Sequence, residues 1–184
     1  MDINQLYQIF KRFPRIITDS RKVIKDTIFF ALRGENFNGN EFVSEALKKG
    51  SAYAVIDDEK YYIPERTILT DNVLKSLQDL ASLHRKRLGI PVLAITGSNG
   101  KTTTRELITA VLSKKFNVTS TSGNLNNHIG LPLTLLDMNS DTDMGIVEMG
   151  ANHPGEIAGL CSIADPDYGI ITNIGRAHLE GFGT

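Results

Sequence analysis

The stretch that most limits what this chain can fold into reads L-A-I-T-G-S-N-G-K-T-T-T-R-E-L, from Leu93 to Leu107. A short apolar strand enters a turn with two glycines, and a lysine and a run of hydroxyls then open a helix. Gly97 and Gly100 allow backbone conformations that other residues resist, so the backbone can approach an anion closely. Amides at the start of the helix point at that anion, and the helix dipole favours negative charge there. The segment therefore predicts a cradle for a polyphosphate.

Two side chains of this loop suit a nucleotide such as ATP. Lys101 can reach the terminal phosphates, and the Thr102 hydroxyl can bind the Mg²⁺ that accompanies them. The general phosphate-loop pattern has a glycine five residues before Gly100, where this chain has Ile95, so the loop is a compact variant. The alternative is an ordinary strand-to-helix turn that happens to contain a lysine. The residues expected to hold ATP, through their backbone amides and side chains, are Gly97, Ser98, Asn99, Gly100, Lys101, Thr102 and Thr103.

Composition narrows the class of partner and the compartment. A formal net charge of −1 gives no basic field that could hold nucleic acid. The hydrophobic share of 41% and charged share of 22% are typical of a globular protein with an apolar core. No apolar run has the length of a membrane span, so we expect no membrane insertion. The single cysteine, Cys161, cannot form an internal disulfide, which agrees with the reducing cytoplasm.

The pattern of elements divides the chain into two α/β segments, 1–88 and 89–184. The first is expected to be a small α/β domain, and Gly89-Ile90-Pro91 breaks the helical pattern at the seam. In the second, strands alternate with helices, which predicts a mostly parallel sheet with ligands at the carboxyl ends of its strands. This second domain is expected to be incomplete. Expected helices are 4–11, 41–49, 73–87, 102–114 and 154–162; expected strands are 27–32, 53–56, 67–69, 92–95, 117–119, 144–148 and 168–172.

Two more side chains are expected at the edge of the sheet that carries the phosphate loop. Glu148 ends an apolar strand, where a carboxylate suits a Mg²⁺ ligand beside bound phosphates. The alternative is an ordinary strand-end acid. His178 follows the next strand and could bind a metal or hold a carboxylate, although a lone histidine in a loop is more often a surface residue. Thr102, Glu148 and His178 are the candidate metal ligands, and Lys101, Glu148 and His178 the candidate catalytic residues.

Two further groups of residues are candidates for substrate binding. Asn124, Asn126 and Asn127 offer uncharged donors and acceptors suited to sugar or carboxylate recognition, unless their loop is only a series of turns. In the first segment, Arg21 and Arg33 could grip a diphosphate through two hydrogen bonds each. The alternative for these arginines is a solvated hairpin.

The chain resembles the Mur ligases of peptidoglycan synthesis. The matching motifs are T-D-S-R (18–21), F-F-A-L-R-G-E-N-F-N-G-N-E-F (29–42), T-G-S-N-G-K-T-T-T (96–104), G-N-L-N-N-H-I-G-L-P (123–132), E-M-G-A-N-H-P-G-E-I (148–157) and I-T-N-I-G-R-A-H-L-E-G-F-G (171–183). The phosphate loop is shared by the whole family and by folylpolyglutamate synthase. Three of these motifs are similar to those of the family member that adds D-alanyl-D-alanine. They are G-N-L-N-N-H-I-G-L-P (123–132), called the asparagine loop below, E-M-G-A-N (148–152) and A-H-L-E-G-F-G (177–183).

The resemblance implies an ATP-dependent amide ligase of three domains, of which this chain holds the first and part of the second. ATP would phosphorylate the terminal carboxylate of UDP-N-acetylmuramoyl-tripeptide, and the amine of D-alanyl-D-alanine would attack the acyl phosphate. The UDP moiety would bind near Ser20, Arg21, Arg33 and Gly34, and the three asparagines would face the muramoyl peptide.

Glu148 and His178 would then hold magnesium, and the protein would act as a monomer. This chain by itself would have little ligase activity. Two alternatives stay open: a nucleotide-dependent switch or binding module built on the same loop, and another ligase of the Mur or folylpolyglutamate type.

Overall fold

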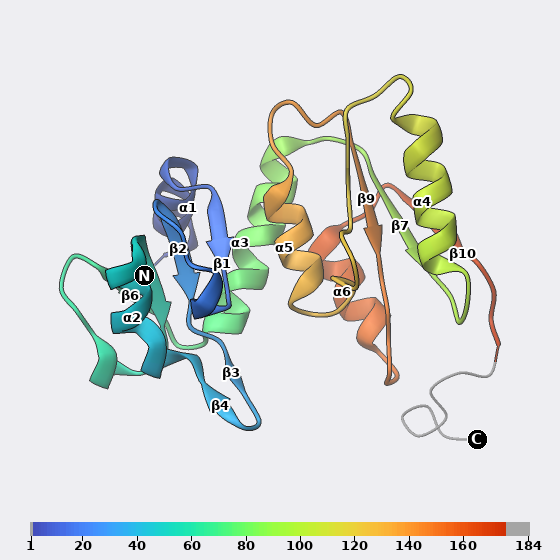
Figure 1. Cartoon of the computed structure of the whole chain (residues 1–184). Helices are drawn as coiled ribbons and strands as arrows, with labels where there is room; N and C mark the ends of the chain where they lie inside the picture. The colour runs from blue at the N-terminus through green and yellow to red at the C-terminus, as the bar shows by residue number, and fades with distance from the viewer. Residues whose placement is uncertain (1, 176–184) are drawn as a thin grey trace. The chain divides into compact units, whose positions relative to one another are not determined.

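The computed structural model describes residues 2–175 and shows two compact units, Met1–Leu80 and Ala81–Thr184 (Figure 1). Each unit holds a four-stranded sheet in which every neighbouring pair of strands runs parallel. The predicted α/β fold, with a mostly parallel sheet in the second segment, is therefore confirmed, and the sheet of the first unit is parallel as well. No helix between residues 2 and 175 is long and apolar enough to cross a lipid bilayer.

The first unit is built on a sheet with strand order β1-β2-β5-β6. A two-stranded antiparallel hairpin, β3 and β4, follows β2. The bounds are α1 Ile3–Arg12, β1 Arg15–Ile17, η1 Ser20–Lys22, β2 Thr27–Phe30, β3 Arg33–Gly34, β4 Phe37–Asn38, η2 Gly39–Phe42, α2 Val43–Lys49, β5 Ser51–Ile56, η3 Glu59–Tyr61 and β6 Thr67–Leu69, with α3 Val73–Leu88 beginning in this unit.

The core of the first unit forms because β2 is apolar on both faces. All four of its residues are buried, as expected for a central strand of a parallel sheet. Phe29 and Ile56 pack with Val43 and Ala46 of α2, which lies against β5. The expected helix at 41–49 opens as the 3₁₀ turn η2, whose start is capped by Asn38, and becomes α-helical only at Val43.

The second unit has strand order β10-β7-β9-β8. Its elements are β7 Val92–Thr96, α4 Lys101–Leu112, β8 Val118–Ser120, α5 Gly130–Asp137, β9 Met144–Glu148, α6 Glu156–Ala164 and β10 Tyr168–Ile171. Helix α6 begins two residues after the expected start, because Glu156 accepts hydrogen bonds from the amides of Asn152 and His153 and holds that turn outside the helix.

Helices cover both faces of this second sheet (Figure 1). Leu93 and Ile95 of β7 face Ile108 and Leu112 of α4. Since side chains alternate along a strand, the residues between them face the opposite side, where α5 contacts β9 and α6 contacts β7. All four strands run the same way, so the loops that follow them meet at one edge of the sheet. The predicted site residues of this unit between residues 97 and 148 lie at that edge: on the loops, in the first turn of α4 and at the end of β9.

The burial of Phe29 makes a prediction about the first unit. Phe29 is 1% exposed, whereas Phe37 on the hairpin is 57% exposed. Phe29→Ala removes a ring from a closed core and should lower the free energy of unfolding by about 3–5 kcal/mol. Phe37→Ala, the matched control, should cost less than about 1 kcal/mol. Urea unfolding followed by circular dichroism measures both, and equal losses would contradict this description of the core.

Candidate functional site

The loop between β7 and α4 depends on its two glycines for different reasons. Gly97 has a φ of +132°, and a Cβ placed on it would lie 2.2 Å from Thr172 Oγ1. Gly100 has a φ of +79° at the N-cap of α4, with nothing within 4 Å of an added Cβ. Gly97 is therefore needed for space as well as conformation, and Gly100 for conformation alone.

Two amides of this loop are held by the neighbouring strand end. Ser98 N donates to the Asn173 carbonyl at 3.1 Å, and Asn99 N donates to Asn173 Oδ1 at 3.0 Å. Thr172 Oγ1 and Asn173 Nδ2 in turn donate to the Asn99 carbonyl at 2.6 and 3.2 Å. The expectation that the whole loop turns its amides to a ligand is thus corrected at Ser98 and Asn99, whose amides brace the loop against β10.

The next amides are placed differently. Within residues 2–175, no hydrogen-bond acceptor is found for the backbone amides of Gly100, Lys101, Thr102 and Thr103. They form the first turn of a twelve-residue helix, where the helix dipole adds positive potential. An anion placed there would accept from several amides at once.

Lys101 folds back over the loop. Its Nζ donates to the carbonyls of Gly97 at 2.7 Å and Ser98 at 3.4 Å. The ammonium therefore lies against the loop between β7 and α4, at the carbonyls of Gly97 and Ser98. A flexible lysine held only by carbonyls can exchange them for phosphate oxygens, which are stronger acceptors because they are charged.

Glu148 occupies the centre of the site. It ends β9 beside β7, in register with Ile95, and is only 2% exposed. Thr102 Oγ1 donates to its Oε2 at 3.0 Å, and Asn126 Nδ2 donates to its Oε1 at 2.9 Å. Three residues predicted separately, from the phosphate loop, from a strand end and from the asparagine loop, are thus brought into direct contact.

The spacing of Thr102 and Glu148 can be compared with what magnesium requires. Mg²⁺ binds six oxygens at about 2.0–2.1 Å, which puts neighbouring ligands about 2.9 Å apart. The Thr102 Oγ1 and Glu148 Oε2 atoms are 3.0 Å apart. Both are hard oxygen donors, so this pair fits adjacent positions on one magnesium ion.

The third predicted ligand, His178, lies outside the described residues. In the part of the chain that the structure describes, no three His, Cys, Asp or Glu side chains gather closely enough to hold a metal ion by themselves.

Two residues of this site, Arg105 and Asn173, were not predicted from the sequence. Arg105, one turn after Thr102 on α4, is 5% exposed and forms an ion pair with Glu148 at 3.3 Å. Its spacing from Thr102 along a helix, facing a predicted strand-end acid, was the available signal. Asn173 carries no comparable signal, because its role follows from which strand lies beside β7.

The three asparagines of the loop have distinct places. Asn126 binds Glu148, and Asn127 Oδ1 accepts from the amides of Ile129 and Gly130 at the start of α5. Asn124 is exposed, and its carbonyl accepts from the amide of Asn126. Asn127 therefore shapes the start of α5 although it is exposed, and Asn124 is exposed as well, whereas Asn126 is half-buried against Glu148.

In the first unit, the two predicted arginines are held by carboxylates. Arg21 donates twice to Asp19, at 2.9 and 2.8 Å, and hydrogen bonds from Arg21 lower the pKa of Asp19 to about 2. Arg33 Nε donates to Asp57 Oδ1 at 2.8 Å. The Ser20 carbonyl accepts a hydrogen bond from Lys49 Nζ at 3.2 Å. Gly34 packs against the ring of Phe37.

Asp57 fixes the position of Arg33. It also accepts from Asn40 Nδ2 at 2.9 Å and from the amide of Val73 at 3.4 Å. Burial by itself would raise the pKa of Asp57, but hydrogen bonds from Arg33 and Asn40 lower it below the ordinary value. The side chain of Arg21 is 85% exposed, against 48% for Arg33. Arg21 is thus held by a weak surface pair that a ligand can displace, while Arg33 is placed in advance.

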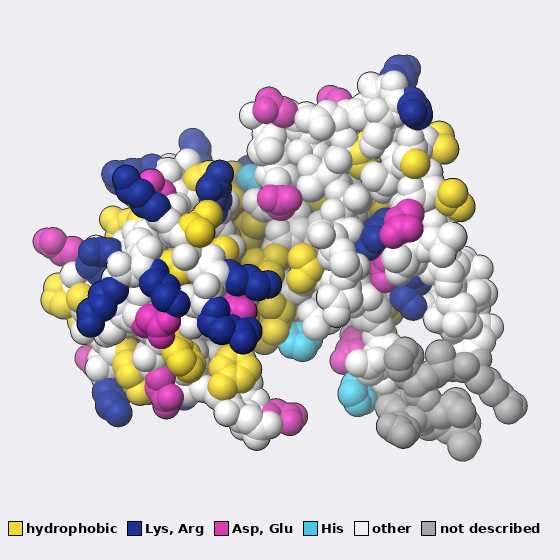
Figure 2. Space-filling view, in the orientation of Figure 1, with side chains coloured by type: hydrophobic (Ala, Val, Ile, Leu, Met, Phe, Trp, Pro, Cys, Tyr) yellow, Lys and Arg dark blue, Asp and Glu magenta, His cyan; other side chains and the backbone are white. Residues whose placement is uncertain are grey.

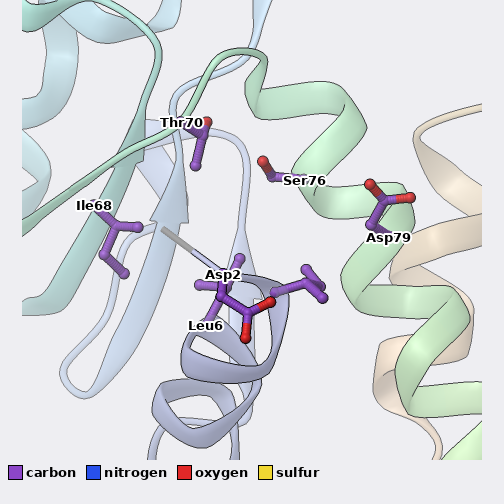
Figure 3. A pocket seen from close by; sticks show the side chains of 7 residues that line it. Asp2, Leu6, Ile68, Thr70, Ser76 and Asp79 are labelled. Carbon is purple, nitrogen blue, oxygen red and sulfur yellow. The ribbon is translucent and has the colours of Figure 1, made fainter.

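A pocket of about 300 Å³ lies elsewhere in the first unit, between α1 and the start of α3 (Figure 3). Its hydroxyls are used within the fold: Thr70 Oγ1 donates to the Ile56 carbonyl and Ser76 Oγ to the Asn72 carbonyl. The pocket is lined by Asp2, Ile3, Leu6, Ile68, Thr70, Ser76 and Asp79, and so by none of the predicted site residues.

The second unit is a parallel sheet in which β7 leads through a turn with two glycines into α4, the arrangement found in the phosphate-loop class of α/β proteins. Comparison with known families is more specific. Residues 13–97 match the Mur ligase family, catalytic domain, and residues 95–184 match the Mur ligase middle domain. The chain belongs to the Mur ligase family, as its motifs predict.

Individual relatives share one name. The chain is 44% identical over 171 residues to the UDP-N-acetylmuramoyl-tripeptide–D-alanyl-D-alanine ligase of Bacillus subtilis, covering 92% of this chain and 37% of that enzyme. It is 38% identical to the Escherichia coli enzyme of that name, covering 92% and 37%. The chain thus spans well under half the length of these relatives.

Solved structures agree with the sequence comparison. The crystal structure of MurF from Acinetobacter baumannii has a TM-score of 0.89 at 34% identity, covering 99% of this chain and 43% of that one. MurF ligase from Thermotoga maritima in complex with ADP has a TM-score of 0.84 at 36% identity, covering 96% and 40%.

The two loop glycines give a prediction about stability. Gly100→Ala forces a left-handed conformation on alanine without a steric contact, which should cost about 1–2 kcal/mol. Gly97→Ala forces alanine to a φ of +132°, which it adopts even less readily, and also brings a methyl group into contact with Thr172, so it should cost more. Urea unfolding of the two variants compares them directly. A Gly97→Ala variant as stable as Gly100→Ala would contradict the close approach of β10 to this loop.

Proposed function

We propose that this chain supplies the nucleotide-binding and UDP-substrate-binding parts of an ATP-dependent amide ligase. Its reaction joins D-alanyl-D-alanine to UDP-N-acetylmuramoyl-tripeptide during the synthesis of peptidoglycan precursors. The shared name of the relatives supports this choice of substrates. The observation that carries the proposal is the contact between Thr102 and Glu148 beside four amides without acceptors among the described residues.

ATP binds with its phosphates at the start of α4 in this proposal. The amides of Gly100–Thr103 hold the phosphate oxygens, and Lys101 leaves the carbonyls of Gly97 and Ser98 to join them. ADP in the related Thermotoga maritima enzyme supports a nucleotide here. The bracing of Ser98 and Asn99 by Asn173 keeps the cradle in shape before the nucleotide arrives. Such preorganisation reduces the entropy lost on binding.

Thr102 and Glu148 are the residues that would hold Mg²⁺, with His178 as a further candidate. The ion supplies positive charge next to phosphate oxygens. Asn126 holds the other carboxylate oxygen of Glu148, so the carboxylate keeps its orientation. This bond also links the nucleotide end of the site to the asparagine loop, where Asn124 is free to face the muramoyl peptide.

The chemistry begins with a carboxylate that is a poor acylating agent. Transfer of the γ-phosphoryl group of ATP to the terminal carboxylate of the tripeptide gives an acyl phosphate, and the amine of D-alanyl-D-alanine displaces phosphate. Two anions must approach each other in the first step. Lys101 offsets this repulsion, and the amide cradle fixes the phosphate against the incoming carboxylate.

The first unit binds the UDP end of the substrate. Arg33 is placed in advance by Asp57, and Arg21 can exchange Asp19 for a phosphate oxygen. On the face seen in Figure 2, Lys and Arg side chains gather over this unit, which suits an anionic ligand. Ser20 and Gly34 lie next to these two arginines. We propose that the protein works as a monomer in the cytoplasm on these small molecules.

Calorimetry on the chain tests the proposal against its rivals. The ligase proposal predicts that the chain binds both ADP with Mg²⁺ and UDP-N-acetylmuramoyl-tripeptide. A nucleotide-dependent switch would bind ADP but has no reason to bind the UDP-linked peptide. Binding of a folate polyglutamate in place of the UDP-linked peptide would favour the folylpolyglutamate type of ligase. The proposal is overturned if the chain does not bind ADP with Mg²⁺, or if it does not bind UDP-N-acetylmuramoyl-tripeptide.

Lys101 gives a quantitative prediction. Lys101→Ala removes a charge-assisted contact of about 1.5–3 kcal/mol, so ADP affinity should fall between about tenfold and a hundredfold. Lys114→Ala removes an exposed lysine just beyond the other end of the same helix and is the matched control. Calorimetry with ADP and Mg²⁺ measures both. An unchanged affinity in Lys101→Ala would remove the lysine from the phosphate site.

A further inference from the structure

Arg105 is a buried cation that the proposed reaction does not use. It lies on α4 one turn beyond Thr102 and is 5% exposed. Its Nη1 donates to Glu148 Oε2 at 3.3 Å and to the Gly123 carbonyl at 3.2 Å, and its Nη2 pairs with Glu106 at 3.3 Å. One guanidinium thus joins the phosphate-loop helix, the end of β9 and the start of the asparagine loop.

The carboxylate that Arg105 contacts is closed off from water. The Glu148 side chain is 3% exposed, and a buried carboxylate without a cation is strongly unfavourable. Its two oxygens already accept from Arg105, Thr102 and Asn126. A carboxylate offers about four lone-pair positions, so these three bonds leave about one open.

We propose that Arg105 is a positioning residue and internal counter-ion for Glu148, which holds the carboxylate in place without a metal and weakens its affinity for a divalent cation. The inference rests on the proposed function, because it takes Thr102 and Glu148 as the cation's ligands. It adds a residue that sets how tightly the ion is held.

The direction of the effect follows from the contacts. When a cation binds Thr102 Oγ1 and Glu148 Oε2, it replaces the hydrogen bond that Thr102 donates to Glu148. The bonds from Arg105 and Asn126 can persist and keep the carboxylate aimed at the ion. The guanidinium of Arg105, whose Nη1 is 3.3 Å from Glu148 Oε2, and the cation would then contact the same oxygen. Two positive charges this close repel each other. Arg105 therefore lowers the affinity of the site for the cation and keeps the Glu148 carboxylate in a fixed orientation.

The test uses Mn²⁺ as the probe, measured by electron paramagnetic resonance with the chain saturated by ADP. Arg105→Gln should bind Mn²⁺ at least tenfold more tightly than the original chain, because the competing charge is gone. Arg105→Lys keeps a positive charge and should stay within threefold of the original. Glu148→Gln gives the background from Mn²⁺ held by ADP alone.

Arg85→Gln is the matched control. Arg85 is also a buried arginine of the second unit and is ion-paired with Asp167 at 2.7 Å. Asp167 precedes β10 and bonds the amide of Val92, so the pair lies at the edge of the sheet opposite Glu148. Its loss should lower stability and leave Mn²⁺ affinity within threefold of the original chain.

A second measurement covers the case in which Arg105→Gln is poorly folded. Thermal unfolding with increasing Mn²⁺, at saturating ADP, should then raise the midpoint of this variant more than that of the original chain. An Mn²⁺ affinity that is unchanged or weaker, or an equal or smaller rise of the midpoint, overturns the inference. So does Arg105→Lys binding as tightly as Arg105→Gln, since the charge would then not be the cause.

The two proposals fail in distinguishable ways. Absence of ADP binding to the original chain would overturn the nucleotide function and this inference together. Normal ADP binding with an Mn²⁺ affinity indifferent to Arg105 would overturn this inference alone.

Discussion

The buried carboxylate of Glu148 is the interaction on which the site depends. Parallel strands bring the ends of β7, β8, β9 and β10 to one edge, and Glu148 stands among them. A carboxylate at that depth needs hydrogen-bond donors, and these come from two segments: Thr102 and Arg105 of α4, and Asn126 of the asparagine loop. Thr121 Oγ1 accepts from the backbone amide of Glu148. Satisfying one buried charge therefore fixes the position of the phosphate loop relative to the asparagine loop.

In the proposed function, part of the phosphate loop's backbone stabilises the fold and part of it binds the anion. The amides of Ser98 and Asn99 donate hydrogen bonds to Asn173, which connects the loop to the residues that follow β10. The amides from Gly100 onward keep the first-turn geometry of a helix, and there a compact loop lacking the usual leading glycine can still hold an anion. Ile95 stands where that glycine belongs; it is fully buried and serves the core beneath α4. The shorter loop thus keeps the binding turn and gives the preceding position to packing.

The sequence predicted the elements well because apolar periodicity decides most of them, as in β9 and the sheet around it. It also predicted that Thr102 and Glu148 would share one edge, which follows from strand direction. It did not predict strand neighbours, so the bracing by Asn173 was invisible. Nor did it predict Arg105, because a basic residue on a helix is ordinarily solvated. The predicted start of α6 differs from the observed one because the Glu156 side chain accepts hydrogen bonds from the amides of Asn152 and His153.

Amide hydrogen exchange, measured by nuclear magnetic resonance with and without ADP and Mg²⁺, shows whether the start of α4 holds phosphate. We expect the amides of Gly100, Lys101, Thr102 and Thr103 to become protected when the nucleotide binds. Those of Ser98 and Asn99 should be protected already and change little. Protection that appears outside this turn, or none at all at saturating ADP, would contradict a phosphate cradle at the start of α4.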